Sequence, residues 1–190
     1  MTEPEPEQDD LREALKRVAV ALKESGVPFA LTGGYAVWAR GGPESVHDVD
    51  FVIAEEDAER VREHLAASGL DVREPPEDWL FKVDVGGVCV DVLFRMSSQA
   101  TTREDLADVD RLEVLSVEMP VLSATSVVLH KLNALDEHYC DFAAVIPVAR
   151  ALREQVDWER IRAGTAGNDF AAALLFLLER LGVVPASPGG

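Results

Sequence analysis

Two aspartates separated by one valine open an apolar run, and this short segment constrains the fold more than any other. Asp48 and Asp50 begin a stretch whose continuation to residue 53 is Phe-Val-Ile, which is typical of a buried strand. Alternate side chains of a strand share a face, so the two carboxylates are expected to point the same way. Like charges held side by side are unfavourable unless a cation neutralises them. The segment therefore indicates a divalent-metal site.

A third carboxylate stands alone in another apolar segment. Asp91 is the one charged residue between positions 88 and 94. A charge inside a buried strand costs free energy unless it is paired or bound to a metal. Three carboxylates on two neighbouring strands would provide the hard oxygen ligands that Mg²⁺ prefers, with Mn²⁺ as an alternative. We therefore predict that Asp48, Asp50 and Asp91 are the metal ligands and the catalytic residues.

A glycine pair precedes these aspartates. Residues 27–31 predict a short strand, Thr32-Gly33-Gly34 a turn, and residues 35–40 the start of a helix. A glycine-rich turn that opens a helix presents free backbone N–H groups, and these can cradle phosphate oxygens. Alone, such a turn is usually a plain connector. The order strand, Gly-Gly turn, helix, Asp-x-Asp strand and Asp strand is much more specific than any one part.

The segments 32–40, 47–51 and 90–94 together resemble the nucleotidyltransferase superfamily typified by DNA polymerase beta. Within it, the chain is most similar to the AbiEii and MenT toxin-like branch and to small antibiotic nucleotidyltransferases of the lincosamide type. The resemblance runs from residue 27 to 94 and continues more weakly to residue 150. It implies an α/β (α+β) fold, in which a mixed β-sheet is flanked by helices and followed by a C-terminal helical region.

The resemblance also implies the activity. Such an enzyme moves a nucleotidyl group from an NTP, such as ATP, to an acceptor hydroxyl and releases pyrophosphate. Two Mg²⁺ ions on the three aspartates would bind the triphosphate and activate the hydroxyl, and Gly33 and Gly34 would hold the triphosphate. One departure matters, because the superfamily commonly has serine at the position of Gly34, so a hydroxyl contact to phosphate is missing.

A second group of candidates lies further along the chain. Ser123 to Ser126 precede an apolar periodic run that predicts a helix over 125–136, with Lys131 on it and Asp141 beyond its end. A lone lysine on a helix is ordinarily solvated surface. The spacing is, however, similar to the AbiEii-like pattern, which implies that Lys131 reaches the nucleotide phosphates and that Asp141 orients it.

Other polar and aromatic residues have more than one interpretation. Arg40 lies between the two motifs and is a candidate phosphate ligand, although a surface pair with a neighbouring acid such as Glu44 is the commoner role. Lys82 alternates with apolar residues, which favours a position facing solvent over one in the active site. Trp38 and Trp79 are expected in the core rather than as platforms for a base.

The sequence pattern divides the chain into four parts. Residues 1–10 carry five acids and no base, the reverse of a signal peptide, and are expected to form a disordered acidic tail. A catalytic domain over 11–121 is followed by a helical region over 122–184 and a flexible tail over 185–190. Within the catalytic domain, strands are predicted over 79–85 and 88–94 and inside 112–121. The Gly-Gly pair between the first two strands predicts a hairpin.

The composition predicts the cellular location of the protein. No 18-residue apolar run exists, so no membrane span is expected. The chain has only two cysteines, Cys89 and Cys140, without CxxC spacing, which is typical of free thiols in a reduced, cytoplasmic setting.

The formal net charge of −17 limits the partners. Binding to a nucleic-acid backbone relies on basic clusters, and the lysines and arginines are scattered. The acceptor therefore stays open between two classes. The leading class is a macromolecule, tRNA or a protein, as the resemblance to AbiEii or MenT-like toxins with an antitoxin partner implies. The other is a cationic small molecule such as an antibiotic, which an acidic surface attracts. A non-catalytic NTP-binding module is a third alternative, although the presence of all three aspartates speaks against it.

Overall fold

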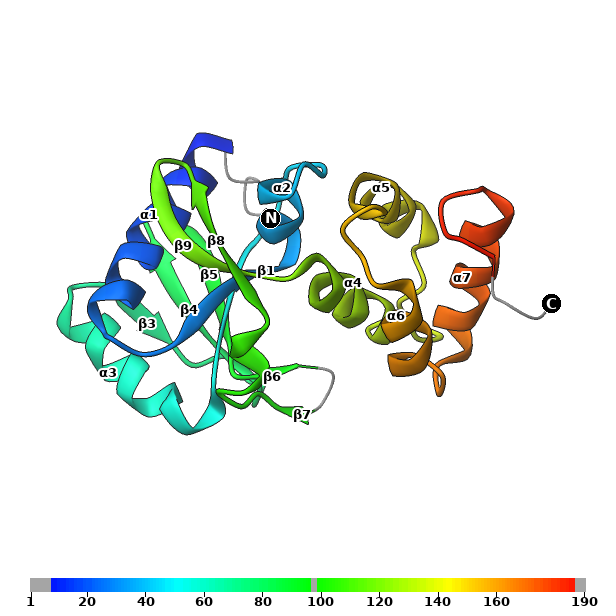
Figure 1. Cartoon of the computed structure of the whole chain (residues 1–190). Helices are drawn as coiled ribbons and strands as arrows, with labels where there is room; N and C mark the ends of the chain where they lie inside the picture. Colours follow the sequence, from blue (N-terminus) through cyan, green and yellow to red (C-terminus); the bar gives the residue numbers. More distant parts are fainter. Residues whose placement is uncertain (1–7, 97–98, 187–190) are drawn as a thin grey trace, which may run out of the picture.

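The computed structural model describes residues 8–96 and 99–186, and its centre is a seven-stranded mixed sheet (Figure 1). The strands follow the order β3-β4-β5-β2-β1-β9-β8. Their bounds are β1 Phe29–Thr32, β2 Val49–Ile53, β3 Asp71–Arg73, β4 Leu80–Val85, β5 Val88–Leu93, β8 Val109–Val114 and β9 Val117–Leu122. The β2/β5 and β1/β9 pairs are parallel, and the other neighbours are antiparallel.

Seven α-helices accompany this sheet in the described residues. They are α1 Gln8–Glu24, α2 Gly33–Ala39, α3 Ala58–Ala67, α4 Ala124–Asn133, α5 Phe142–Leu152, α6 Trp158–Gly164 and α7 Asp169–Arg180. Two short 3₁₀ helices, Glu55–Asp57 and Asp105–Ala107, and a small ribbon of β6 (Arg95–Met96) and β7 (Gln99–Ala100) complete the fold. The expected mixed sheet flanked by helices, with a helical C-terminal region, is confirmed.

Helix α1 shows why the sheet has a core on one side. Leu11, Leu15, Val18 and Leu22 recur at helical spacing and are fully buried. The helix packs against the central strands and against α3. On β5, every second residue is buried while the residues between are at least partly exposed. This alternation leaves the other face of β5 free to carry polar side chains.

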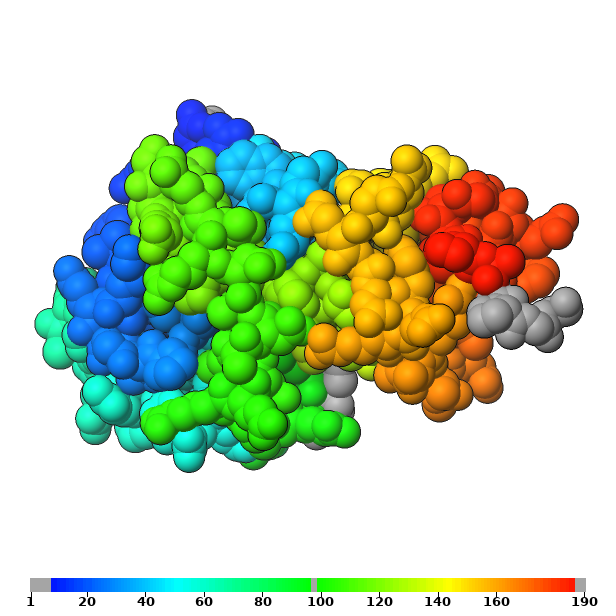
Figure 2. Space-filling view, viewed as in Figure 1, coloured from blue at the N-terminus to red at the C-terminus, as the bar shows by residue number. Residues whose placement is uncertain are grey.

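Helices α5, α6 and α7 form a second lobe, coloured yellow to red, that stands beside the sheet (Figure 2). Helix α4 follows β9 directly and connects the two lobes (Figure 1). Ser123, Asp141, Asp157 and Asn168 accept backbone N–H groups at the starts of α4 to α7. Each of these helices therefore begins at a polar residue that precedes an apolar periodic run in the sequence.

The ends of the chain differ in part from the expectation. Helix α1 begins at Gln8, so the last three residues assigned to the acidic tail are helical. Their acids lie in the first turn, where negative charge is favourable to a helix. Residues 1–7, and residues 187–190 of the expected C-terminal tail, lie outside the described residues. In the part of the chain that is described, every helix is too short or too polar to cross a membrane.

Candidate active site

A row of polar side chains crosses four strands of the sheet. The backbone register places Thr32 opposite Asp50, Asp50 opposite Asp91, and Asp91 opposite Lys82. Directly paired residues on neighbouring strands point to the same face, so these four side chains stand side by side. We call Thr32, Asp50, Asp91 and Lys82 the active-site row. The row brings two of the three predicted aspartates together across the parallel β2/β5 pair.

Three members of the active-site row, Thr32, Asp50 and Asp91, line a pocket of about 710 Å³ between the sheet and helix α4, and Lys82 adjoins it through Asp91. Asp48, Asp50 and Asp91 all line it, and Gly33 lies at one end. Lys131 lines it from the opposite wall, on α4. The volume is within the range of pockets that hold small ligands and nucleotides. Five of the predicted site residues are thus gathered around one cavity.

Gly33 is required at its position by the carboxylate beside it. Its φ is +62°, in the left-handed region, and a Cβ atom there would lie 1.9 Å from Asp50 Oδ2. Any larger residue would push the carboxylate of Asp50 away from the turn. The Gly-Gly motif therefore has a local reason that is independent of any ligand: it lets the backbone approach the central aspartate.

Gly34 is constrained by a different neighbour. A Cβ on Gly34 would lie 2.6 Å from Cβ and 2.8 Å from Oγ of Ser45. Ser45 in turn donates its hydroxyl hydrogen to Asp48 Oδ1 over 2.7 Å. Ser45 thus occupies the space that a side chain at position 34 would need, and it orients the first aspartate.

Asp50 carries the least favourable charge in the pocket. Burial, followed by the charges of Asp48 and Asp91, raises the pKa of Asp50 to about 7, although Lys131 and Lys82 lower it. A carboxylate whose charge is disfavoured in this way is typical of a functional site, where a bound cation or substrate completes the electrostatics. Asp48 is exposed and immediately precedes β2, so only Asp50 of the predicted pair lies on the strand, although the charge of Asp48 still acts on Asp50.

Lys82 is a member of the site that the sequence interpretation missed. Its Nζ lies 2.8 Å from Asp91 Oδ1, and it faces the active-site row rather than bulk solvent. Burial lowers the pKa of Lys82, but the hydrogen bond and the charge of Asp91 outweigh it and hold the pKa above its ordinary value. The signal was available, because a two-residue hairpin at Gly86-Gly87 places Lys82 opposite Asp91 by counting outward from the turn.

Asp141 is not brought to the pocket, in contrast to Lys131. Its side chain is exposed and accepts the backbone N–H of Ala144 over 3.2 Å, so it caps helix α5. The predicted helix over 125–136 is α4, which ends at Asn133. Asp141 is the N-cap of the next helix, α5, so its carboxylate is engaged there and does not orient Lys131.

Arg40 also lies outside the pocket, and its expected role as a phosphate ligand has to be corrected. Its side chain is 7% exposed and donates to the carbonyl of Leu122 and to the carboxylate of Asp110, each over 2.8 Å. A third bond goes to the carbonyl of Val121. Because these acceptors take up the guanidinium, Arg40 ties α2 to the β8/β9 hairpin instead of facing a ligand.

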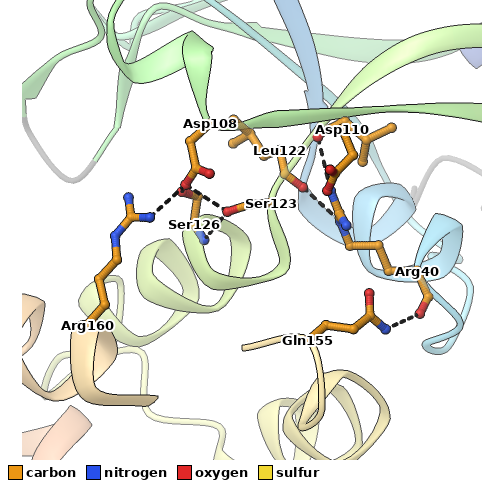
Figure 3. A network of polar contacts seen from close by, with 9 residues as sticks. Arg40, Asp108, Asp110, Leu122, Ser123, Ser126, Gln155 and Arg160 are labelled. Carbon is orange, nitrogen blue, oxygen red and sulfur yellow. Dashed lines mark hydrogen bonds and ion pairs between the residues drawn. The ribbon is translucent and has the colours of Figure 1, made fainter. Parts of the chain in front are cut away.

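Arg40 belongs to a wider set of polar contacts between the sheet and the C-terminal helices (Figure 3). Asp108 accepts hydrogen bonds from Ser123, Ser126 and Arg160, and Gln155 donates to the carbonyl of Arg40. Burial alone would raise the pKa of Asp108, but these three donors outweigh it and lower the pKa. We call the following residues the interlobe network: Arg40, Asp108, Asp110, Ser123, Ser126, Gln155 and Arg160.

The pocket is also lined by residues that the sequence did not assign to the site. Trp79 was expected in the core, but it is 41% exposed and lines the cavity together with Asp78. Asp78 pairs with Arg95 over 3.0 Å. On α4, His130 lines the pocket and its Nδ1 is buried without a hydrogen-bond partner. Trp79 immediately precedes β4, so its exposure follows from its place at the end of a strand and was not visible in the apolar pattern.

The carboxylates of Asp48, Asp50 and Asp91 and the hydroxyl of Thr32 are the candidate cation ligands that line the pocket at this point. Within residues 8–96 and 99–186, no three Asp, Glu, His or Cys side chains are gathered closely enough to form a complete cation site. Ser45 holds one oxygen of Asp48, and Lys82 holds one oxygen of Asp91. The arrangement can therefore bind a cation only with further ligands or after a change in these two contacts.

Comparisons with known proteins agree with this fold. A family model described as "Uncharacterised nucleotidyltransferase" matches residues 7–185. No curated protein sequence matches the chain. The crystal structure of ANT(2")-Ia in complex with adenylyl-2"-tobramycin has a TM-score of 0.60 and 14% identity, over 86% of this chain and 96% of that chain.

Two further structures are similar. The solution structure of the antibiotic-resistance factor ANT(2'')-Ia has a TM-score of 0.59 and 15% identity, over 90% of this chain and 97% of that one. An antigenic nucleotidyltransferase-like protein from Paracoccidioides brasiliensis has a TM-score of 0.53 and 14% identity, over 88% and 93% of the two chains. At these identities the similarity shows the fold.

Proposed function

Because this chain belongs to the family of uncharacterised nucleotidyltransferases, we propose that its pocket transfers a nucleotidyl group from an NTP to an acceptor hydroxyl in a Mg²⁺-dependent reaction. The single observation that supports this most is the half-buried carboxylate of Asp50, which lies beside the charges of Asp48 and Asp91 with two lysines nearby. Clustered negative charge of this kind is stabilised when a divalent cation and an anionic substrate bind together.

The donor set of the pocket fits Mg²⁺, or Mn²⁺ in its place. Asp48, Asp50 and Asp91 would hold the metal, and water and triphosphate oxygens would complete its shell, as Mg²⁺ commonly requires. A metal held by these three carboxylates would supply positive charge to the triphosphate and would favour deprotonation of the attacking hydroxyl. The incomplete protein ligand set supports a metal that arrives with its substrate.

The residues of the chain have separate roles in the proposed reaction. Backbone N–H groups of the Gly33-Gly34 turn and the ammonium of Lys131, on opposite walls, bind and orient the triphosphate. The acceptor oxygen attacks the α-phosphorus, the bond from that phosphorus to the bridging oxygen breaks, and pyrophosphate leaves. The carboxylate of Asp91 accepts the proton of the acceptor hydroxyl. Positioning and electrostatics supply most of the catalysis.

A cationic small molecule is the acceptor that the pocket favours. The formal net charge of −17 attracts cations, and Trp79 offers an exposed aromatic face beside the carboxylate of Asp78. The similar structure of ANT(2")-Ia holds adenylyl-2"-tobramycin, an adenylylated antibiotic. The other acceptors predicted from the sequence were tRNA or a protein, with an antitoxin as partner, and the experiment below includes them.

The first test is label transfer from each of the four α-labelled NTPs with Mg²⁺. The acceptors are tobramycin, total RNA, a bacterial extract and the protein itself, and the control is the Asp48→Asn/Asp50→Asn double variant. Label on tobramycin that disappears in the control supports the small-molecule acceptor. Label on RNA or protein instead would replace it with a macromolecular one, and no transfer to any acceptor would contradict the proposed function.

The role of Lys131 is tested by Lys131→Ala. Loss of one ammonium that contacts the triphosphate is expected to raise the KM for the NTP roughly tenfold or more. The matched control is Lys16→Ala, which removes a lysine whose ion pair with Glu13 lies on α1, outside the pocket. An unchanged KM in Lys131→Ala would remove this residue from the phosphate site.

A further inference from the structure

The ion pair between Lys82 and Asp91 joins neighbouring strands inside the proposed active site. Nζ of Lys82 lies 2.8 Å from Oδ1 of Asp91, and the side chains of Lys82 and Asp91 are 34% and 21% exposed, respectively. The pairing follows from the hairpin register, in which Lys82 stands directly opposite Asp91. Lys82 is therefore held over a carboxylate that the proposed reaction needs, and the proposed mechanism assigns it no task.

The same contact interferes with metal binding. Nζ of Lys82 occupies Oδ1 of Asp91, while Asp48 is held by Ser45. An ammonium group and a divalent cation repel each other and compete for the same carboxylate oxygen. In this arrangement the described carboxylates are not gathered into a three-ligand site. A metal that uses Asp91 must displace Lys82 or share the carboxylate with it.

We propose that Lys82 is a positioning residue that holds Asp91 in the metal-free protein and releases it only when a divalent cation arrives with a triphosphate. This inference rests on the proposed function. The triphosphate brings negative oxygens that attract both the metal and the ammonium of Lys82, so the ion pair with Asp91 loses its advantage. Metal and nucleotide then bind cooperatively, because each is disfavoured without the other.

A purely structural ion pair would behave differently. A cross-strand pair of opposite charges stabilises a sheet modestly, and its removal would lower stability without any effect on metal affinity. A competing ammonium has the opposite effect on the metal, because its removal frees an oxygen ligand and removes a repulsive charge. Metal affinity in the absence of nucleotide therefore separates the two roles.

The experiment measures Mn²⁺ binding to the full chain by electron paramagnetic resonance, without nucleotide. In Lys82→Met we expect Mn²⁺ to bind roughly tenfold more tightly than in the wild type, the effect of losing one competing charge-assisted hydrogen bond. Lys82→Arg, which keeps the cation, should bind Mn²⁺ as the wild type does. Lys16→Met is the matched control, since it removes the same charge from helix α1, where Lys16 pairs with Glu13 outside the pocket.

The same titration is repeated with a non-hydrolysable ATP analogue. In the wild type the analogue should tighten Mn²⁺ binding by a larger factor than in Lys82→Met. Unchanged or weaker Mn²⁺ binding by folded Lys82→Met, or an equal gain in Lys16→Met, would overturn the proposal. Lys82→Gln, which keeps a hydrogen-bond donor without the charge, replaces Lys82→Met if that variant unfolds.

The two proposals can fail separately. If the wild type transfers no label but Lys82→Met still binds Mn²⁺ more tightly, the proposed function is wrong and the competition between Lys82 and metal stands. If label is transferred and the Mn²⁺ affinity of Lys82→Met is unchanged, the function stands and Lys82 has a structural role.

Discussion

The active-site row and the interlobe network use similar residues in opposite ways. In the interlobe network, Asp108 accepts three hydrogen bonds and its pKa is lowered (Figure 3). In the active-site row, burial and two neighbouring carboxylates raise the pKa of Asp50 to about 7. Both aspartates lie near the junction of the two lobes, so location alone does not explain the difference.

The difference lies in whether the protein itself supplies the partners of each charge. A carboxylate that has its full set of donors stabilises the fold and has little capacity left for a ligand. A carboxylate among like charges costs stability and gains when a cation binds. The comparison thus separates polar residues that hold the lobes together from those that are available for chemistry.

The sharpest test of this contrast is the pair Asp50→Asn and Asp108→Asn. Asp50→Asn should lower nucleotidyl transfer by about a thousandfold or more, because metal-site charge contributes several kcal/mol to the transition state. Its stability without metal should equal or exceed that of the wild type, since a repelled charge is removed. In Asp108→Asn the rate of nucleotidyl transfer should stay within about tenfold of the wild-type rate. Label transfer and thermal unfolding measure both variants, and full activity in folded Asp50→Asn would contradict the contrast.

The next largest effect concerns stability at Arg40. Arg40→Met removes three hydrogen bonds from a side chain that is 7% exposed. We expect a loss of about 2–3 kcal/mol in the free energy of unfolding, because two strand carbonyls lose a charged donor. Urea denaturation measures it.

The KM for the NTP should be unchanged in Arg40→Met, since Arg40 lies outside the pocket. Arg111→Met is the matched control. Arg111 is an exposed arginine on β8 that pairs with Glu118 over 3.4 Å, and its replacement should leave the free energy of unfolding almost unchanged. A raised KM with normal stability in Arg40→Met would restore its predicted role at the phosphates.

A smaller effect should appear in the pH dependence of stability. The pKa of Asp108 is lowered in the folded protein, so its contribution to stability is present above the ordinary value of 3.8 and is lost as the pH falls below it. The stability difference between wild type and Asp108→Asn should therefore be largest near pH 6 and should narrow below pH 4. Denaturation at a series of pH values measures it, and a constant difference would show that the carboxylate charge is unimportant there.

The smallest expected effect is at Asp141. Asp141→Ala removes the cap of α5 and should cost about 0.5–1 kcal/mol, with an unchanged KM for the NTP. Asp157→Ala provides a comparison, because that cap of α6 accepts two backbone N–H groups and should cost more. A change in KM for Asp141→Ala would indicate a route from this cap to Lys131 that the described contacts lack.

Local pattern predicted much of the fold and the centre of the site. Apolar runs located β2 and β5, and the three aspartates proved to line one pocket. The second hairpin was harder to predict. Its turn residues, Leu115 and Ser116, adopt positive φ without glycine, so the segment contains two strands, β8 and β9, where one was predicted.

Local sequence is enough to predict which residues share a strand face, where helices begin, and that Lys82 stands opposite Asp91 across a two-residue hairpin. These properties depend on neighbours a few residues away. Three features depend on contacts between distant segments. Strand β2 pairs in parallel with β5, helix α4 brings Lys131 to the pocket that the aspartates line, and Arg40 donates to the β8/β9 hairpin. Such contacts join segments distant in the chain, and burial and charge then decide which polar groups find partners and which are left for a ligand.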